Sequence, residues 1–192
     1  MPDRNPAALD FLLTRRSRPA KTLTGPVPDR DALMPILQAG LRSPDHGKLE
    51  PWRLIVLDRA ALARLAALVP ETGERLGRTP EEVAKARDQF ANADLAVAVI
   101  EVQKPSAKVP AIEQSYSAGA VCLALLNAAL ASGWGANWLS GWASHDRQFA
   151  ARALSLAENE RIAGFIHIGT ETNPPPERPR PDADTIISWV ME

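Results

Sequence analysis

Residues 95–102 form a nearly continuous run of branched aliphatic residues and alanine, bounded by charged residues. Such a run is typical of a strand covered on both faces, because a half-exposed strand alternates apolar and polar side chains. We therefore expect residues 95–102 to form a central strand of a sheet, with other elements packed on both sides. This requirement constrains the fold more than any other feature of the chain.

A long apolar tract, about residues 112–130, repeats its apolar side chains at helical spacing. It approaches the ~20 residues that cross a bilayer, but it is rich in alanine and contains Glu113, Gln114 and Asn127. We interpret it as a buried central helix and expect no association with membranes. Cys122, the only cysteine, lies inside this tract, so we expect a small core residue rather than a reactive thiol.

Capping residues, prolines and apolar periodicity predict the other elements. Further helices are expected over residues 5–16, 29–42, 60–69, 80–90 and 145–154, and further strands over 53–57, 134–141 and 162–168. Pro35 fits the second helix only if it lies in the first turn. Ser144 is expected to cap the helix that follows it, and residues 71–79 are expected to form a mobile excursion.

The chain has 192 residues and a formal net charge of −1. This length suits one domain, so we expect a single domain over residues 1–192. The near-neutral charge provides no global positive field to hold DNA or RNA, so no nucleic-acid partner is expected. Arg15 and Arg16 interrupt the N-terminal apolar stretch too early for a signal peptide, and we expect a cytoplasmic protein.

Residues 172–192 have the composition of a proline-rich arm. Prolines 174–176 are followed by alternating proline and arginine, a stiff extended pattern that does not pack as helix or strand. The arm nevertheless ends in an apolar cluster, Ile186, Ile187, Trp189 and Val190. We therefore expect this C-terminal arm to dock, and a partner subunit is one candidate for the surface.

Three guanidinium groups and a hydroxyl lie together after the first predicted helix, at Arg15, Arg16, Ser17 and Arg18. Guanidinium forks match phosphate oxygens in a bidentate manner and serine adds a neutral donor, so this cluster can hold a phosphate dianion. The alternative is a set of cations placed favourably at a helix C-terminus. These residues alone leave both interpretations open.

The loop from Arg42 to His46 and the glycine-rich segment 133–141 are the other candidates for chemistry. Ser43, Asp45 and His46 offer the groups of a hydrolytic triad, but triad members meet through folding, and the chain lacks a Gly-x-Ser-x-Gly elbow. The glycines of residues 133–141 either let the backbone approach a planar ligand or mark turns around core tryptophans. Rossmann and P-loop motifs are absent from the sequence, and no histidine has a partner at metal-ligand spacing, so no metal is expected.

Taken together, five motifs in this order resemble the nitroreductase family of FMN enzymes, most closely its compact YdjA-like branch. They are Arg15-Arg16-Ser17, Ala39 to His46 leading to Pro51-Trp52, Glu113-Gln114 with Ser117 to Gly119, Gly133 to Gly141, and Gly164-Phe165 to Gly169-Thr170. The motifs span almost the whole chain. The resemblance implies an α+β fold, a nitroreductase-like sandwich with a mainly antiparallel sheet flanked by helices, which is dimeric and binds two FMN molecules at the interface.

The resemblance also implies site residues. The implied FMN contacts are Arg15, Arg16, Ser17, Arg42, His46, Trp138, Leu139 and Ser140. The nicotinamide nucleotide is associated with the end of the long helix, here Ala128, Ala129, Leu130, Ala131, Ser132 and Gly133. Whether Arg18, Arg178 or Arg180 contacts FMN stays open.

By this resemblance the protein is an NAD(P)H-dependent FMN oxidoreductase, in which the flavin carries hydride and no side chain need act as a conventional acid or base. NAD(P)H would reduce the flavin, leave, and be replaced by a nitroaromatic, a quinone or a similar small acceptor. Backbone amides near Trp138 would hydrogen-bond flavin N5, and Arg42 would stabilise negative charge on the reduced ring. The alternatives are a non-catalytic flavin-binding or flavin-storing protein, a flavin-free interaction protein, and a specialised reaction within the family.

Overall fold

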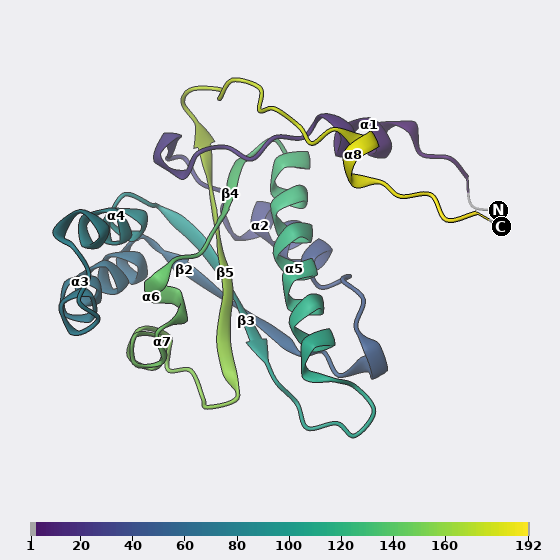
Figure 1. Ribbon diagram of the computed structural model, residues 1–192. Helices are drawn as coiled ribbons and strands as arrows, with labels where there is room; N and C mark the ends of the chain where they lie inside the picture. Colours follow the sequence, from purple (N-terminus) through teal and green to yellow (C-terminus); the bar gives the residue numbers. More distant parts are fainter. Residues whose placement is uncertain (1–2, 192) are drawn as a thin grey trace.

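The computed structural model describes residues 3–191 and consists of an antiparallel sheet with helices on both faces (Figure 1). Within these residues the sheet has five strands in the order β1-β5-β3-β2, and β4 pairs with β5. The strands are β1 (Leu23–Thr24), β2 (Trp52–Asp58), β3 (Leu95–Val102), β4 (Gly135–Leu139) and β5 (Glu160–Glu171). The helices are α1 (Pro6–Thr14), α2 (Arg30–Gly40), α3 (Arg59–Arg75), α4 (Pro80–Ala91), α5 (Ala111–Ala131), α6 (Trp142–His145), α7 (Arg147–Leu154) and α8 (Ala183–Ile186).

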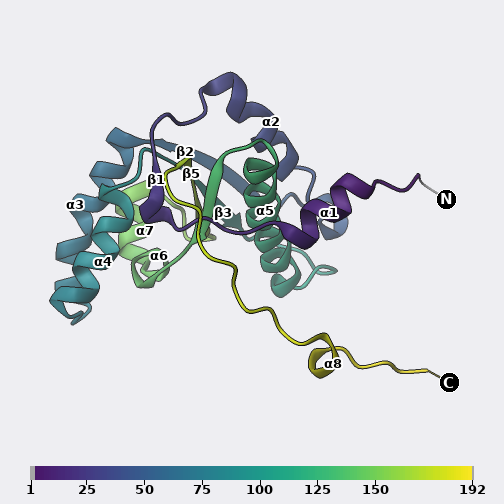
Figure 2. The ribbon, with the colours of Figure 1, turned by 90° about the horizontal axis from the view of Figure 1, so that it is seen from above.

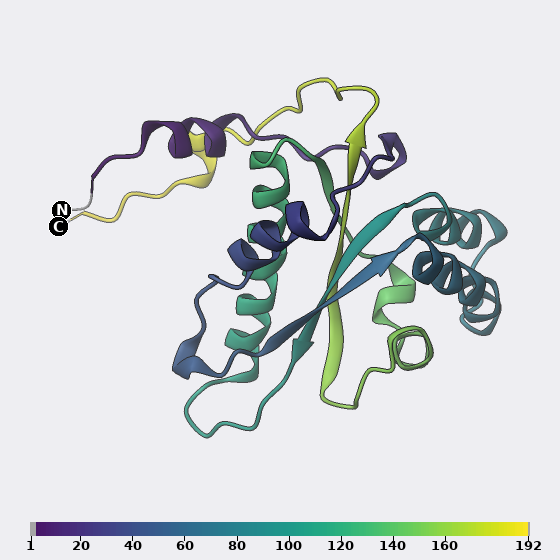
Figure 3. The same cartoon turned by 180° about the vertical axis from the view of Figure 1, so that it is seen from behind.

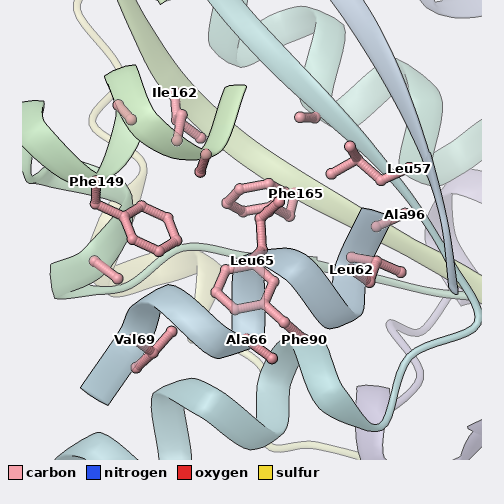
Figure 4. Close-up of a cluster of buried hydrophobic side chains, with 14 of the residues drawn as sticks. Leu57, Leu62, Leu65, Ala66, Val69, Phe90, Ala96, Phe149, Ile162 and Phe165 are labelled. Carbon is pink, nitrogen blue, oxygen red and sulfur yellow. The ribbon is translucent and has the colours of Figure 1, made fainter. Parts of the chain in front are cut away.

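β3 is the buried centre of the sheet, as its composition predicts. It pairs with β2 on one edge and with β5 on the other, and Leu95 to Ile100 are at most 6% exposed. Its side chains alternate between two apolar clusters. One cluster lies against α3, α4 and α7 and is built around Phe90, Phe149 and Phe165 (Figure 4). The other lies against α2 and α5, so both faces of the strand are covered.

α5 is the long central helix that the apolar tract predicts. Its inner face packs on the sheet and on α2, and Val121, Cys122 and Leu125 are fully buried there. By length and composition alone α5 is apolar enough to cross a membrane, but 44% of its apolar window is buried inside the fold. Because its inner face belongs to the core, the length and composition of α5 are only weak evidence for a membrane span.

The helical hairpin of α3 and α4 differs from the prediction. α3 continues through Pro70 to Arg75, so most of the expected mobile excursion is helix. Thr72 and Gly73 are buried in the hairpin, where a Cβ on Gly73 would clash with Val83 of α4. Tertiary packing therefore outweighs the local proline and glycine signals that predicted a break.

Two other local predictions are wrong. Pro35 lies inside α2 rather than in its first turn, where it leaves the carbonyl of exposed Asp31 without its helical donor. Ser144 does not cap α7; instead Asp146 accepts a 2.7 Å hydrogen bond from the backbone N–H of Phe149 and starts the helix at Arg147. Ser144 lies instead inside the one-turn helix α6, where it is buried.

The two ends of the chain project from the body of the molecule. α1 is capped by Asn5 as predicted, but none of its residues is buried, and α8 is exposed throughout. The helices overlap in Figure 1, but the view from above shows that α1 and α8 lie apart (Figure 2). The apolar cluster at the end of the arm is exposed, with Trp189 79% and Val190 97% accessible.

Candidate functional site

Residues 15–18 run along the start of β4. The backbone N–H of Arg18 donates to the carbonyl of Ala136 at 2.8 Å, and the side-chain amide of Asn137 donates to the carbonyl of Arg18 at 2.6 Å. α1 ends one residue earlier, at Thr14. The arginine cluster therefore has a fixed place on the sheet, although it follows a projecting helix.

A cleft of about 320 Å³ opens at this point, between residues 11–18, the C-terminal end of α5 and the start of β4. Arg15 and Arg16 line it, and their Nε atoms are buried and have no hydrogen-bond partner among residues 3–191. Arg15 also donates from Nη2 to the hydroxyl of Ser17 at 2.8 Å. Buried guanidinium donors without partners are costly unless an anion completes them, so the cleft fits an anionic group.

The charges around Arg15 support the same conclusion. Burial, together with the positive charges of Arg180, Arg16 and Arg18, lowers the pKa of Arg15. Arg18 forms an ion pair with Glu171 at 3.4 Å, which neutralises part of this charge. Among the residues described, no cluster of histidine, cysteine, aspartate and glutamate is suited to a metal ion.

The C-terminal arm brings Arg180 to this cluster. Its Nη2 atom donates to the backbone carbonyl of Arg15 at 3.4 Å and lies 2.9 Å from a carboxylate oxygen of Glu177. Sequence reasoning left this residue open, because its proline-rich surroundings give no indication of where the arm passes. The structure therefore places a further guanidinium beside Arg15.

The outer edge of β4 leads away from the cleft. The carbonyl of Ala136 points away from β5, towards Arg18. In an antiparallel strand the backbone groups of every second residue face the same edge, so the N–H and C=O of Trp138 also point away from β5. β4 pairs only with β5 within the described chain, so this edge has no strand beside it. Leu139 ends the strand and Ser140 follows in an exposed position. The five residues of β4 span about 17 Å.

Arg42 and His46 lie elsewhere. Nδ1 of His46 is 2.7 Å from a carboxylate oxygen of Glu113 in the first turn of α5, and Ser117 of the same helix donates to the carbonyl of Pro44 at 2.8 Å. The 21 residues of α5 rise by about 30 Å. Figure 3 shows the loop beside one end of α5 and the N-terminal segment beside the other. One chain therefore does not bring His46 to the arginine cluster, and Arg42 lies on the same loop, two residues after Gly40, which packs on Leu125 of α5.

The segment expected to meet the nicotinamide nucleotide divides in the structure. Leu130 and Gly133 line the cleft, whereas Ala129 is fully buried in the core. Gly133 has φ +83°, a left-handed conformation that ends α5 and favours glycine. Part of this segment therefore forms a wall of the cleft beside Arg15.

A larger depression of about 810 Å³ lies beside α6, α7 and the start of β5. Its charged groups are largely satisfied within the chain. Arg161 pairs with Glu101, Arg147 donates to the carbonyl of Glu160 at 2.6 Å, and Asp146 pairs with Arg75. Size alone therefore does not make it the better candidate for an anionic ligand.

The chain belongs to the nitroreductase family, whose model ("Nitroreductase family") matches residues 12–170. The Escherichia coli (strain K12) protein named "Putative NAD(P)H nitroreductase YdjA" is 34% identical over 163 residues, which cover 85% of this chain and 87% of that protein. A Haemophilus influenzae protein named "Putative NAD(P)H nitroreductase" is 34% identical over 165 residues, covering 85% and 88%.

Solved structures confirm the predicted α+β fold. A nitroreductase-like family protein from Bacillus cereus superimposes with a TM-score of 0.77 at 23% identity, covering 99% of this chain and 98% of the other. A "putative nitroreductase in complex with fmn" from Desulfovibrio desulfuricans gives a TM-score of 0.75 at 21% identity, covering 99% and 100%. At these identities the likeness shows the shared fold.

Proposed function

We propose that this chain is a cytoplasmic, single-domain NAD(P)H-dependent oxidoreductase that binds FMN as a homodimer and reduces nitroaromatics, quinones or similar acceptors in a ping-pong cycle. The observation that carries the proposal is the pair of buried guanidinium Nε atoms of Arg15 and Arg16, which lack partners in the described chain. They lie at one end of a strand whose outer edge is open. Family membership and the relatives named as NAD(P)H nitroreductases support the activity.

The residues present fit FMN along β4. Arg15, Arg16 and Ser17 would hold the phosphate, because their hydrogen-bond donors lie close together and the neighbouring arginines give this region an excess of positive charge. Arg180 adds a cation from the C-terminal arm. The open edge of β4 then offers the backbone N–H of Trp138 to the polar edge of the ring. When bound, FMN supplies the hydride chemistry that links NAD(P)H to the acceptor.

The remaining expected contacts, Arg42 and His46, support a dimer. A two-fold axis across the middle of α5 would set the helices of two copies antiparallel, so the loop of one copy would meet the arginine cluster of the other. Arg42 of the second copy would then place positive charge beside the ring. The same axis would bring Leu130 and Gly133 close to the partner.

The outer face of α5 is suited to such pairing. Ile112, Tyr116 and Leu123 are 53%, 68% and 46% exposed at helical spacing, and a Cβ on Gly119 would meet nothing within 4 Å. An apolar stripe with a small residue lets two helices approach closely. The exposed apolar residues of α1 and of the C-terminal arm would extend the buried area, as expected if the arm docks on a partner subunit.

The absorption spectrum of the purified protein tests this proposal, followed by anaerobic mixing with NADH or NADPH in a stopped-flow spectrometer. A flavin spectrum that bleaches with the nicotinamide alone, and recovers with an added quinone, is the expected result. A protein that binds FMN but does not bleach would instead be a flavin-binding or flavin-storing protein. A colourless protein that takes up no added FMN would contradict the flavin site itself.

A further inference from the structure

Gly164 of β5 and Trp138 of β4 share one position on the sheet. A Cβ built on Gly164 would lie 2.6 Å from Cδ1 of the Trp138 indole and closer still to its Nε1. Trp138 is directly opposite Ile166, so Gly164 is its diagonal neighbour across the two strands. The indole therefore lies across β5 in the space that a side chain at position 164 would occupy.

This contact acts on the residue whose backbone faces the open edge of β4. The N–H and C=O of Trp138 point outward, while its indole turns back over the neighbouring strand, and the residue as a whole is 37% exposed. β4 is held on one side by β5 and at its start by Arg18 and Asn137. A displaced indole would have to change its side-chain torsions or rotate the peptide of Trp138, and the second of these moves the outward N–H.

We propose that Gly164 is a positioning residue. Because it has no side chain, the Trp138 indole can pack over β5, and this contact fixes the orientation of the outward backbone N–H of Trp138 towards the ring of the bound cofactor. The inference rests on the proposed FMN site and assigns a role to a glycine that lies one strand away from it.

Other buried glycines of the chain differ in what surrounds them. A Cβ on Gly40 would meet Cδ2 of Leu125 at 2.5 Å, and a Cβ on Gly73 would meet Val83. These neighbours lie away from the open edge of β4, in the core and in the α3–α4 hairpin. The Trp138 indole belongs to the residue whose backbone N–H faces that edge, so the same intrusion at position 164 acts beside the proposed ring site.

The test is a double-mutant cycle on the intact protein, with Gly164→Ala, Trp138→Leu and the pair combined. FMN affinity is measured by quenching of flavin fluorescence, the environment of the bound ring by visible circular dichroism, and folding by thermal melting. Gly73→Ala is the matched control, because it introduces a clash of the same kind in the α3–α4 hairpin.

We expect Gly164→Ala to weaken FMN binding about tenfold and to change the visible dichroism, but to change affinity less than about twofold when Trp138 is already leucine. Trp138→Leu alone should also weaken binding about tenfold, because the N–H loses its fixed orientation. Gly73→Ala should lower the melting temperature only. Equal effects of Gly164→Ala in both backgrounds, or unchanged affinity of Trp138→Leu, would overturn the inference while leaving the FMN site intact. Failure of the wild-type protein to bind FMN would overturn both.

Discussion

Arg15 and His46 lie at opposite ends of α5, Arg15 in the cleft beside Gly133 and His46 in contact with Glu113 of the first turn. The length of the helix, about 30 Å, keeps them apart in one chain. If both contact FMN, each site must be assembled from two chains. The separation therefore links cofactor binding to dimer formation in the proposed enzyme.

Arg15→Ala is expected to weaken FMN binding by about tenfold to a hundredfold, the loss typical of a hydrogen bond between charged groups. The melting temperature of the apoprotein should hardly change, because the relief of repulsion among neighbouring cations offsets the loss of the hydrogen bond from Arg15 to Ser17. Equilibrium dialysis against FMN and thermal melting measure the two quantities. Arg87→Ala, at an exposed pair with Asp88, is the control; a larger effect on stability than on affinity would argue against a phosphate role.

Leu123→Asp should separate the dimer and release flavin, because it places a charge on the apolar outer face of α5. Sedimentation or light scattering reports the mass, with 20.8 kDa expected for the monomer. Leu76→Asp serves as control, since Leu76 is also exposed, at 38%, but caps the C-terminal end of α3, away from α5. A Leu123→Asp protein that stays dimeric would place the interface elsewhere.

His167 predicts an acid-sensitive step in stability. It is 1% exposed, neither ring nitrogen has a hydrogen-bond partner among residues 3–191, and burial lowers its pKa from 6.5 to about 4. The folded state favours the neutral ring, so its stabilisation is complete above pH 6.5 and falls as pH drops from 6.5 towards 4. The loss over that window is on the order of 3 kcal/mol.

Urea unfolding between pH 7.5 and pH 4.5 measures this term, with His167→Leu as the comparison. Hydrogen bonds from Arg53 lower the pKa of Glu160 below 4.5, so the stabilisation from this carboxylate is lost only at more acidic pH. The free energy of unfolding should fall with pH in the wild type and much less in His167→Leu. Parallel pH profiles for the two proteins would contradict this assignment.

Cys122 should be inert in the folded protein. It is fully buried in α5, and burial raises the pKa of its thiol to about 12. A disulfide reagent that reports free thiols at pH 8 should therefore react in urea but not in buffer, since the thiolate is the nucleophile. Rapid reaction of the native protein would show that α5 opens far more readily than its packing indicates.

The sequence predicts the layers of the fold well, because the central strand, the long helix and most helix boundaries depend on local composition and spacing. β3 and α5 lie close to where their apolar runs place them. Features decided by distant contacts are missed. β1 has only two residues and exists because Leu23 and Thr24 pair with the end of β5, and α3 passes through Pro70 because Gly73 packs on α4.

The candidate site follows the same division. Arg15 and Arg16 are adjacent in sequence and both line the cleft, and Ser17 accepts a hydrogen bond from Arg15, so their grouping is predictable. Asn137 and Arg180 are not, because what brings them there is the path of β4 and of the C-terminal arm. The contact between Gly164 and the Trp138 indole is also not predictable, because it depends on how β4 and β5 pair.

Subunit mixing tests most directly whether each FMN site is built from two chains. One copy carries Arg15→Ala and Arg16→Ala, the other carries Arg42→Ala and His46→Ala, and the mixed dimer is isolated with two affinity tags. We predict that each mutant homodimer loses FMN, whereas the mixed dimer regains one FMN with near wild-type affinity, because one of its two sites then contains only unaltered residues. A mixed dimer that binds no FMN, or an Arg42/His46 mutant homodimer that binds FMN normally, would contradict the account.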